Sequence, residues 1–584
     1  VLNTIWTEEE LERKLSNKVK RYLAENNINF YVINAIEIAR QVGLGGRINM
    51  IMQSVFFKLA NIIEPEQAIK YLKEAVVTAY ERKGEKIVNM NFEAIDKALT
   101  AYRKIEVKEE WKTLQDENEK TKNYIPAFIK EFCEPINNLE GDSLKVSDFI
   151  KHGVEDGTLM HGTTHFEKRG IAVNIPEWVQ DKCIQCNQCA YVCPHACIRP
   201  FLATSKEVKS APKGYKSIKA NGISKDGPQY QYTIGITPLD CTGCNSCVEA
   251  CPAPGKALVM KPVETQDDQI EAWDYAVRRL KAKPNPTTKT TVKGSQFEEP
   301  LLEFSGACAG CGETPYAKLV TQLFGDRMMI ANATGCSTIW AASGASTSYK
   351  ANKNGNGPAW ANSLFEDNAE FGFGMHLGVE SIRERIATKI EEALSLELSP
   401  KEREAMQTWL DNKDKGENSR VIADRLIAVL EESDLEIAKE ILKDKYFLVK
   451  RSQWIFGGDG WAYDIGFGGL DHILASGENV NVLVFDTEIY SNTGGQSSKA
   501  TPQASVAKFA TTGKTTKKKD LGLMAMTYGN VYVAQISMGA NMNQTIKAIV
   551  EAENYNGPSL IIAYATCIAH GIKLGMGSTP YEEK

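Results

Sequence analysis

Two stretches decide the fold of this chain: Cys183-Ile-Gln-Cys186-Asn-Gln-Cys189-Ala-Tyr-Val-Cys193-Pro194 and Cys241-Thr-Gly-Cys244-Asn-Ser-Cys247-Val-Glu-Ala-Cys251-Pro252. Each reads C-x2-C-x2-C-x3-C-P, so eight cysteines recur at one spacing. Three thiols two residues apart can wrap one metal centre, whereas the fourth, followed by proline, leaves that loop. Disulfides and a zinc site are the alternatives, and the doubled spacing favours iron–sulfur ligation over both.

The doubled spacing resembles that of bacterial ferredoxins with two [4Fe-4S] clusters, in which the fourth cysteine of each run binds the other cluster. We therefore expect two sets of ligands, Cys183, Cys186, Cys189 and Cys251 for one cluster and Cys193, Cys241, Cys244 and Cys247 for the second. A chain of this kind moves single electrons. Cys197 lies outside the ligand spacing, and Cys133 stands alone, so both are predicted to be free thiols.

Length and composition are those of an ordinary globular protein. The 584 residues suggest about four domains. The chain is 43% apolar and 24% charged, with a net charge of −6, which gives no sign of nucleic-acid binding. No run of eighteen apolar residues occurs, so we expect no transmembrane helix and no membrane partner. The fourteen cysteines cluster at metal spacings, which favours a reducing cytoplasm. Because the first residue is Val1, we expect the chain to begin partway through a longer polypeptide.

The pattern along the chain predicts four segments. Residues 1–120 alternate helical and extended signals, with a capping box at Thr7, and predict a partial α/β domain. Residues 121–168 are polar and predict a connecting arm. Residues 169–290 carry the cysteine runs, and residues 291–584 alternate strand-like runs with helices, which predicts a doubly wound parallel sheet. The predicted strands of that sheet are 328–331, 454–456, 480–485, 531–534 and 560–563, and Ser399 opens a predicted capping box among its helices.

Two turns in the last segment predict a site for a diphosphate and a metal ion. Gly457-Gly458-Asp459-Gly460 follows the predicted strand 454–456, and Asp486-Thr487-Glu488-Ile489-Tyr490-Ser491-Asn492 follows the strand 480–485. Glycines let backbone amides approach a phosphate, an aspartate can bind Mg2+, and ligands collect at the carboxyl ends of parallel strands. The pair of turns resembles the thiamine diphosphate signature, with Thr487 where many such enzymes place asparagine. The alternative is a tight turn with a capping aspartate.

Four further cysteines predict a third metal centre: Cys308, Cys311, Cys336 and Cys567. The first two form another C-x2-C, and the other two each follow a predicted strand. Residues that follow parallel strands converge at one edge of the sheet, so the four thiols can meet beside the diphosphate site. A [4Fe-4S] cluster, a zinc ion and, for Cys336 and Cys567, unliganded buried thiols are the alternatives, and two clusters nearby favour the first.

A two-cluster ferredoxin segment followed by a thiamine diphosphate segment resembles the single-chain pyruvate:ferredoxin (flavodoxin) oxidoreductases. The resemblance covers essentially the whole chain and is close at four stretches, 308–315, 357–368, 458–466 and 490–498. It implies that residues 1–120 are the end of the gamma-like α/β domain of the family. It also implies that the chain is the C-terminal half of the enzyme. The glutamate that activates the aminopyrimidine and the groups that grip the substrate carboxylate would then lie in the N-terminal half.

The resemblance also implies roles for individual residues. The cofactor-binding set would be Gly458, Asp459, Gly460, Trp461, Cys336, Thr487, Ile489 and Asn492. Within it, Asp459, Thr487 and the carbonyl of Ile489 would bind Mg2+, Cys336 would lie close to the thiamine, and Asn492 would face the substrate as a catalytic residue. Cys308, Cys311, Cys336 and Cys567 would hold the proximal cluster.

The activity that this resemblance implies is oxidative decarboxylation of pyruvate with coenzyme A to acetyl-CoA and CO2. Three [4Fe-4S] clusters, thiamine diphosphate and Mg2+ would be the cofactors, and ferredoxin or flavodoxin the electron acceptor. A homodimer in the cytoplasm, serving anaerobic metabolism, would be the functional form. Two alternatives remain: an oxidoreductase for another 2-oxoacid, and a subunit that only transfers electrons.

Overall fold

The computed structural model describes residues 1–115, 125–222 and 229–584. Contacts divide the chain into two compact units, Val1–Tyr124 and Ile125–Lys584. The predicted boundaries after residues 168 and 290 both fall inside the second unit, and the one after residue 120 lies outside the described residues.

The first unit is a small α/β fold. Its sheet has the order β1-β2-β3, with β1 (Leu2–Asn3) parallel to β2 (Phe30–Ile33) and β3 (Arg103–Ile105) antiparallel to β2. Its helices are α1 (Glu8–Lys14), α2 (Asn17–Glu25), α3 (Ala35–Gln41), α4 (Asn49–Ala60), α5 (Pro65–Tyr80) and α6 (Glu85–Ala101). The predicted capping box is present, because Thr7 and Glu10 each accept the backbone N–H of the other at the start of α1.

The segment before the cysteine runs is folded. It forms the short helices η3 (Ile129–Cys133), α7 (Glu134–Asn137) and α8 (Val146–His152). Phe128, Phe132 and Cys133 pack there with Ala345 from the C-terminal part of the chain. Burial raises the pKa of Cys133 to about 12, and its thiol points to the carbonyl of Ala345 at 3.6 Å. The described part of the predicted arm is therefore packed structure, held to the rest of this unit.

Two small sheets hold the cysteine runs. Strand β4 (Asn174–Trp178) pairs antiparallel with β8 (Leu258–Pro262), and the second sheet has the order β5-β7-β6. The strands of the second sheet are β5 (Ile198–Ala203), β6 (Ile218–Lys219) and β7 (Gln231–Ile236). One run lies between β4 and β5 and carries the short helix α9 (Gln188–Tyr191), and the other lies between β7 and β8 and carries α11 (Ser246–Glu249).

A six-stranded sheet organises the C-terminal part, and every neighbouring pair in it is parallel, with the order β12-β9-β13-β14-β18-β17. The strands are β9 (Met328–Ala333), β12 (Ala359–Ser363), β13 (Ser452–Gly458), β14 (Asn481–Asp486), β17 (Tyr532–Ile536) and β18 (Ser559–Tyr564). Five of them were predicted. Strand β12 was not, because Ala-Trp-Ala-Asn-Ser contains no β-branched residue and two polar ones.

Both faces of this sheet are covered. Along β14, Val482 and Val484 belong to one apolar core, whereas Leu483 and Phe485 belong to the other. The first core includes residues of α16 (Asn368–Leu394), α20 (Phe467–Ser476) and α21 (Leu521–Met526). The second includes residues of α14 (Thr314–Phe324), α15 (Cys336–Ala341) and α22 (Met542–Asn554). The doubly wound parallel sheet predicted from the alternating strands and helices is thus confirmed.

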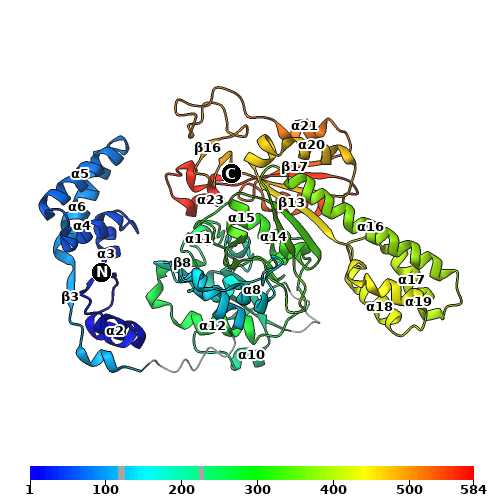
Figure 1. Ribbon diagram of the computed structural model, residues 1–584, viewed down its shortest axis with the longest axis horizontal. Helices are drawn as coiled ribbons and strands as arrows, with labels where there is room; N and C mark the ends of the chain where they lie inside the picture. Colours follow the sequence, from blue (N-terminus) through cyan, green and yellow to red (C-terminus); the bar gives the residue numbers. More distant parts are fainter. Residues whose placement is uncertain (116–124, 223–228) are drawn as a thin grey trace. The chain divides into compact units, whose positions relative to one another are not determined.

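Helix α16 extends away from the sheet into a helical lobe, to the right in Figure 1. The lobe contains α17 (Pro400–Asn412), α18 (Ser419–Glu431) and α19 (Glu436–Lys443), with an apolar core of its own around Trp409. The predicted capping box at Ser399 and Glu402 opens α17.

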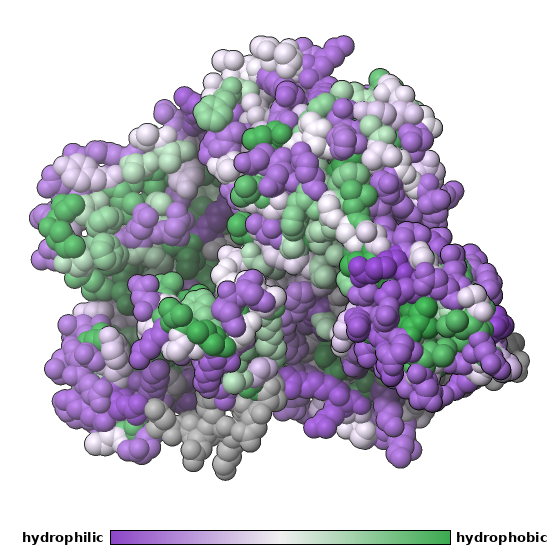
Figure 2. Space-filling model, turned by 45° about the vertical axis from the view of Figure 1, so that its right-hand side comes forward, coloured by the Kyte–Doolittle hydropathy of each residue, from purple (hydrophilic) through white to green (hydrophobic). Residues whose placement is uncertain are grey.

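The surface of the protein carries both hydrophilic and apolar residues. On the face in Figure 2, apolar residues form several groups, some of them broad, among hydrophilic ones. None of the helices that the structure describes has both the length and the apolar character needed to cross a membrane.

Candidate active site and metal centres

The carboxyl ends of four neighbouring strands bring the predicted site residues to one edge of the sheet. Cys336 follows β9, Asp459 follows β13, Thr487 follows β14 and Cys567 follows β18. Since these strands are adjacent and parallel in the order β9-β13-β14-β18, the sheet itself sets the four side chains side by side.

Oxygen atoms converge at the middle of this edge. The hydroxyl of Thr487 lies 3.0 Å from the carboxylate Oδ1 of Asp459 and 3.1 Å from the carbonyl oxygen of Ile489. The hydroxyl of Ser498 donates to the other oxygen of Asp459, and Ser491 lies 2.5 Å from Thr487. The structure therefore brings together the three groups that were predicted to bind Mg2+.

The carboxylate of Asp459 is buried, with only 1% of the residue exposed. Burial and the nearby carboxylate of Asp486 raise its pKa to about 8. Lys518 neutralises the second carboxylate, because its ammonium lies 2.7 Å from Asp486 and 2.9 Å from Glu488. Asp459 has no such partner among the described ion pairs, so a cation bound between Asp459, Thr487 and Ile489 would supply the missing positive charge. The oxygen donors fit a hard cation such as Mg2+.

The two glycines beside Asp459 differ in the space around their Cα atoms. At Gly460 a Cβ would lie 2.5 Å from the ring of Tyr490, so a side chain has no room there. At Gly458 a Cβ would have its nearest neighbour, the carbonyl oxygen of Phe485, 4.0 Å away, which leaves space beside this strand end. Trp461 is fully buried, and its indole N–H has no hydrogen-bond partner within the described structure. Asn492 lies exposed in the turn between β15 (Ile489–Tyr490) and β16 (Gln496–Ser497).

The last four cysteines also come together at this edge. Burial raises the pKa of Cys336, as do the carboxylate of Glu313 and the thiols of Cys311, Cys567 and Cys308. Cys308 and Cys311 lie in one turn, in which the amide of Cys311 donates to the carbonyl of Cys308 at 3.1 Å. The loops after two strands and the turn before α14 thus form one site.

Two functional candidates at this edge were not predicted from the sequence. The carboxyl group of Glu313 is buried, accepts the indole N–H of Trp340 at 2.7 Å, and has its pKa raised to about 7 by burial. The ring of His570 accepts the amide N–H of Cys567 at Nδ1, so Nε2 carries the proton that it donates to the carbonyl of Thr487 at 2.6 Å. His570 therefore ties the loop of Cys567 to the turn of Thr487. Neither residue belongs to a repeated spacing, so only the fold could reveal them.

The eight cysteines of the two runs separate into the expected sets. Burial raises the pKa of Cys189, and the thiols of Cys186, Cys183 and Cys251 raise it further. Burial likewise raises the pKa of Cys247, as do the thiols of Cys244, Cys193 and Cys241 and, last in order, that of Cys189 from the other set. A small cavity is lined by the second set, Cys193, Cys241, Cys244 and Cys247. The fourth cysteine of each run thus joins the other run.

Within the described residues, no three His, Cys, Asp or Glu side chains come close enough to hold a single metal ion. A tetrahedral zinc site needs all of its thiolates within about 2.3 Å of one point, whereas a cubane carries its irons at separate corners. Which group each of the three sets holds stays a prediction.

Cys197 and its neighbours pack against the second set. The thiol of Cys197 donates to the carbonyl of Asp240 at 3.1 Å, and its own amide points to the thiol of Cys193 at 3.3 Å. His195 is buried, and its two ring nitrogens lie 3.2 Å from the carbonyls of Ser305 and Cys308. The second set therefore lies against the turn of the C-terminal cysteines.

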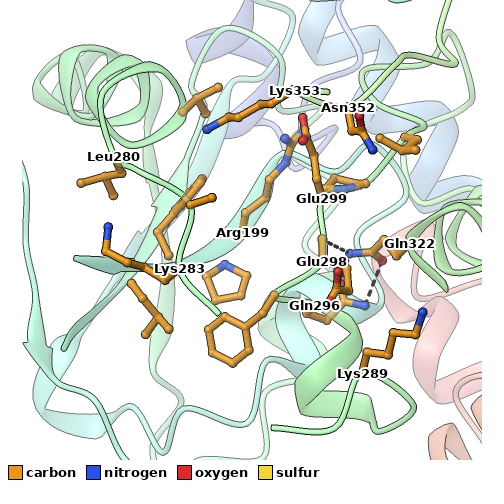
Figure 3. A pocket seen from close by; sticks show the side chains of 18 of the residues that line it. Arg199, Leu280, Lys283, Lys289, Gln296, Glu298, Glu299, Gln322, Asn352 and Lys353 are labelled. Carbon is orange, nitrogen blue, oxygen red and sulfur yellow. Dashed lines mark hydrogen bonds between the residues drawn. The ribbon is translucent and has the colours of Figure 1, made fainter. Parts of the chain in front are cut away.

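A cavity of about 550 Å3 lies between β5, α12 (Asp268–Arg278) and the segment around α14, and Figure 3 shows part of its lining. There Gln322 hydrogen-bonds to Gln296 and to the carbonyl of Glu298, and Lys283, Lys289 and Lys353 are among the lining residues. None of the predicted site residues lines it. It marks the seam between the cysteine-run region and the six-stranded sheet and is separate from the site at the sheet edge.

Four family models match the chain. They are described as pyruvate ferredoxin/flavodoxin oxidoreductase over residues 2–101, a domain of unknown function over 115–172, a 4Fe-4S dicluster domain over 182–254, and the C-terminal TPP-binding domain of thiamine pyrophosphate enzymes over 445–563. The dicluster match covers both cysteine runs, and the thiamine match covers both turns at the sheet edge. The chain thus carries domains of the kinds that bind [4Fe-4S] clusters and thiamine diphosphate.

Similar proteins match over the whole chain. The pyruvate-flavodoxin oxidoreductase of Klebsiella pneumoniae is 55% identical over 100% of this chain and 49% of its own length, and the pyruvate:ferredoxin oxidoreductase of Moorella thermoacetica is 53% identical over 98% and 49%. The mitochondrial pyruvate dehydrogenase [NADP(+)] of Euglena gracilis is 46% identical over 100% and 32%. The chain spans about half the length of the first two. A solved 2-oxoglutarate:ferredoxin oxidoreductase from Magnetococcus marinus covers 45% of this chain and 65% of its own, at 15% identity and a TM-score of 0.27, too weak a likeness to inform the fold.

Proposed function

The chain belongs, along its whole length, to the pyruvate:ferredoxin (flavodoxin) oxidoreductases, and on that premise we propose that it is the cofactor-binding and electron-conducting part of such an enzyme. The reaction would be oxidative decarboxylation of pyruvate with coenzyme A to acetyl-CoA and CO2. One observation carries the proposal: a set of four cysteines and a buried oxygen-ligand site lie at one sheet edge, tied together by His570.

The residues at this edge would each have a part. Asp459, Thr487 and the carbonyl of Ile489 would hold Mg2+, and the glycines before the helix would let backbone amides approach the diphosphate. When bound, thiamine diphosphate supplies the electron sink for decarboxylation, and iron–sulfur clusters take electrons one at a time. Cys336 would line the thiamine side of the proximal set, and exposed Asn492 would face the substrate.

The proposal also covers the number of clusters, the oligomeric form and the electron acceptor. The three cysteine sets would hold three [4Fe-4S] clusters, and the functional form would be a cytoplasmic homodimer that contains the N-terminal half. Relatives carry names with flavodoxin, ferredoxin or NADP(+), so the family alone does not fix the acceptor. We propose ferredoxin or flavodoxin because two cluster sets lie in the dicluster segment.

The first test is the content of the full-length protein purified without oxygen. Three clusters predict about twelve iron and about twelve acid-labile sulfide per chain, with one thiamine diphosphate. About eight of each would leave Cys308, Cys311, Cys336 and Cys567 without a cluster, with zinc the next assignment to examine. Clusters without thiamine would favour the subunit that only transfers electrons.

The second test is substrate choice. Reduction of flavodoxin or ferredoxin by the full-length protein should require both coenzyme A and pyruvate. Equal or faster reduction with 2-oxobutyrate or 2-oxoglutarate in place of pyruvate would assign the enzyme to another 2-oxoacid.

A further inference from the structure

A buried lysine reaches from the sheet into the first cysteine run. Lys318 lies in the middle of α14, and only 2% of the residue is exposed. Its ammonium donates to the backbone carbonyls of Ala190, Tyr191 and Cys193, the last two at 3.0 Å. A neutral amine has two N–H groups, whereas an ammonium has three. Three carbonyl acceptors therefore match the charged form of this side chain.

These carbonyls belong to a structural element that serves both ferredoxin-type sets. They lie at the end of α9, which carries Cys189 of one predicted set and leads directly to Cys193 of the other. The last carbonyls of a helix lack intrahelical partners and carry partial negative charge. The carbonyl of Ala190 also accepts the backbone N–H of Cys193 at 3.3 Å, so Lys318 adds donors and a positive charge at the point where the two sets share one backbone.

No carboxylate neutralises this charge. Among the described ion pairs, Lys318 has no aspartate or glutamate partner, unlike Lys283 of the same region, which pairs with Glu207 at 2.9 Å. Burial lowers the pKa of Lys318 to about 8, and Arg199 lowers it further, whereas the thiols of Cys193, Cys189 and Cys197 act in the opposite direction, Cys193 most strongly. The uncompensated charge is therefore directed at cysteine sulfur.

We propose that Lys318 is a potential-setting residue, which holds α9 against the thiamine-type domain and stabilises an added electron on the group bound by Cys193, Cys241, Cys244 and Cys247. The inference rests on the proposed function, because it needs clusters in these sets. Reduction adds one negative charge to a cluster, and net charge and burial set its potential. A fixed cation in a low-dielectric interior favours the reduced state, so its removal must make the potential more negative. Lys318 forms no bond and transfers no proton in this role.

The test uses Lys318→Met in the full-length protein, purified without oxygen and titrated against redox potential with detection by electron paramagnetic resonance. Methionine fills a similar volume without charge. We expect the ratio of reduced to oxidised Cys193-containing cluster to fall at least tenfold at a given potential, which is a shift of 59 mV for one electron. The Cys189-containing cluster should shift less, and the C-terminal cluster least. Lys283→Met is the matched control and should leave all potentials unchanged.

The outcomes separate the two proposals. If the parent protein binds no clusters, the proposed function fails. If all three clusters are present and Lys318→Met leaves their potentials within the error of the control, Lys318 has only a structural role and this inference is wrong. If Lys318→Met does not fold, Lys318→Gln, which keeps two N–H donors but no charge, is titrated instead. An unshifted potential in that variant overturns the inference equally.

Discussion

At the residue scale, Asp459 carries a buried carboxylate that destabilises the fold unless a cation is bound beside it. Its carboxylate is buried beside Asp486, and both features raise its pKa to about 8. Two hydroxyl groups, those of Thr487 and Ser498, donate to it, but no cation does among the described residues. Burying an unpaired carboxylate is unfavourable, and the proposed Mg2+ would supply the positive charge that offsets this cost.

Asp459→Asn should therefore separate binding from folding. Mg2+ and thiamine diphosphate retained after gel filtration should fall by more than the roughly 10- to 100-fold that loss of a supporting residue costs at a metal site. Thermal stability in EDTA should be equal to or higher than that of the parent, because the unpaired charge is gone. Asp471→Asn, which changes an exposed carboxylate of α20, is the control and should keep both ligands. Retained Mg2+ in Asp459→Asn would contradict the assignment.

Residues that act in sets could be predicted from the sequence, and residues that act singly could not. The spacing of the eight cysteines predicted two ligand sets because ligation constrains several positions at once. Glu313, His570 and Lys318 occupy no repeated pattern. Glu313 and Lys318 are recognised by their burial, and His570 by its hydrogen bond to the distant carbonyl of Thr487. From the sequence alone, a single lysine in an apolar helix is predicted to lie at the surface, and only the packing shows that Lys318 is buried.

At the scale of elements, the segment that follows each strand of the six-stranded sheet carries the residues of the candidate site. The loop after β18 carries Cys567 and His570, and the helix after β9 begins at Cys336. The predicted strands were found because continuous apolar runs are typical of parallel strands buried on both faces. Strand β12 escaped prediction because polar residues interrupt it, and it pairs only at the edge of the sheet.

Cys567→Ala tests whether these loops share a cluster. The variant should lose one cluster, so iron per chain should fall from about twelve to about eight, with the two ferredoxin-type clusters retained. The matched control is Cys197→Ala, which removes a buried thiol next to a set but outside it and should keep about twelve. Unchanged iron in Cys567→Ala would show that the C-terminal cysteines hold no cluster through this residue.

Across the whole second unit, one buried carboxylate joins the regions before and after the cysteine runs. Glu303 is 2% exposed and pairs with Arg199 of β5, with His165 at 3.2 Å and with Lys350 at 3.6 Å. Although burial alone would raise it, the pKa of Glu303 is held well below its usual range, first by Arg199 and then by Lys350. The seam between the two regions thus depends on a buried charge network.

Glu303→Gln should destabilise the second unit by about 3–5 kcal/mol at pH 7, because it leaves Arg199 buried without its partner. Urea unfolding without oxygen, followed by tryptophan fluorescence, measures the change. The double variant Arg199→Met/Glu303→Leu should recover much of the loss, since it removes both charges. Glu299→Gln, a more exposed partner of Lys350, is the control with an expected effect below about 1 kcal/mol. An equally small effect for Glu303→Gln would contradict a structural role for the network.

The stability of the last residues of the chain should decrease as the pH rises, because of the buried carboxyl group of Glu583. Glu583, which is 7% exposed, accepts the amide N–H of Gly539 at 2.6 Å, and burial raises its pKa to about 8. A carboxyl group with a raised folded-state pKa contributes stability that is complete below its unfolded pKa of 4.5 and is lost as pH rises through 8. The preceding segment η12 (Met576–Ser578) contacts α11, which carries Cys247, so loosening there would reach the second cysteine set.

Hydrogen exchange of the segment 576–584, corrected for intrinsic rates, measures this response. Protection should fall by about tenfold or more between pH 6.5 and 8.5, because the unfolded carboxyl group is already ionised while the folded one is still losing its proton. Glu583→Gln cannot ionise and should remove the pH dependence while keeping the contact with Gly539. The surface variant Glu582→Gln should leave it unchanged. Protection that is independent of pH in the parent would show that Glu583 enters the folded state already charged.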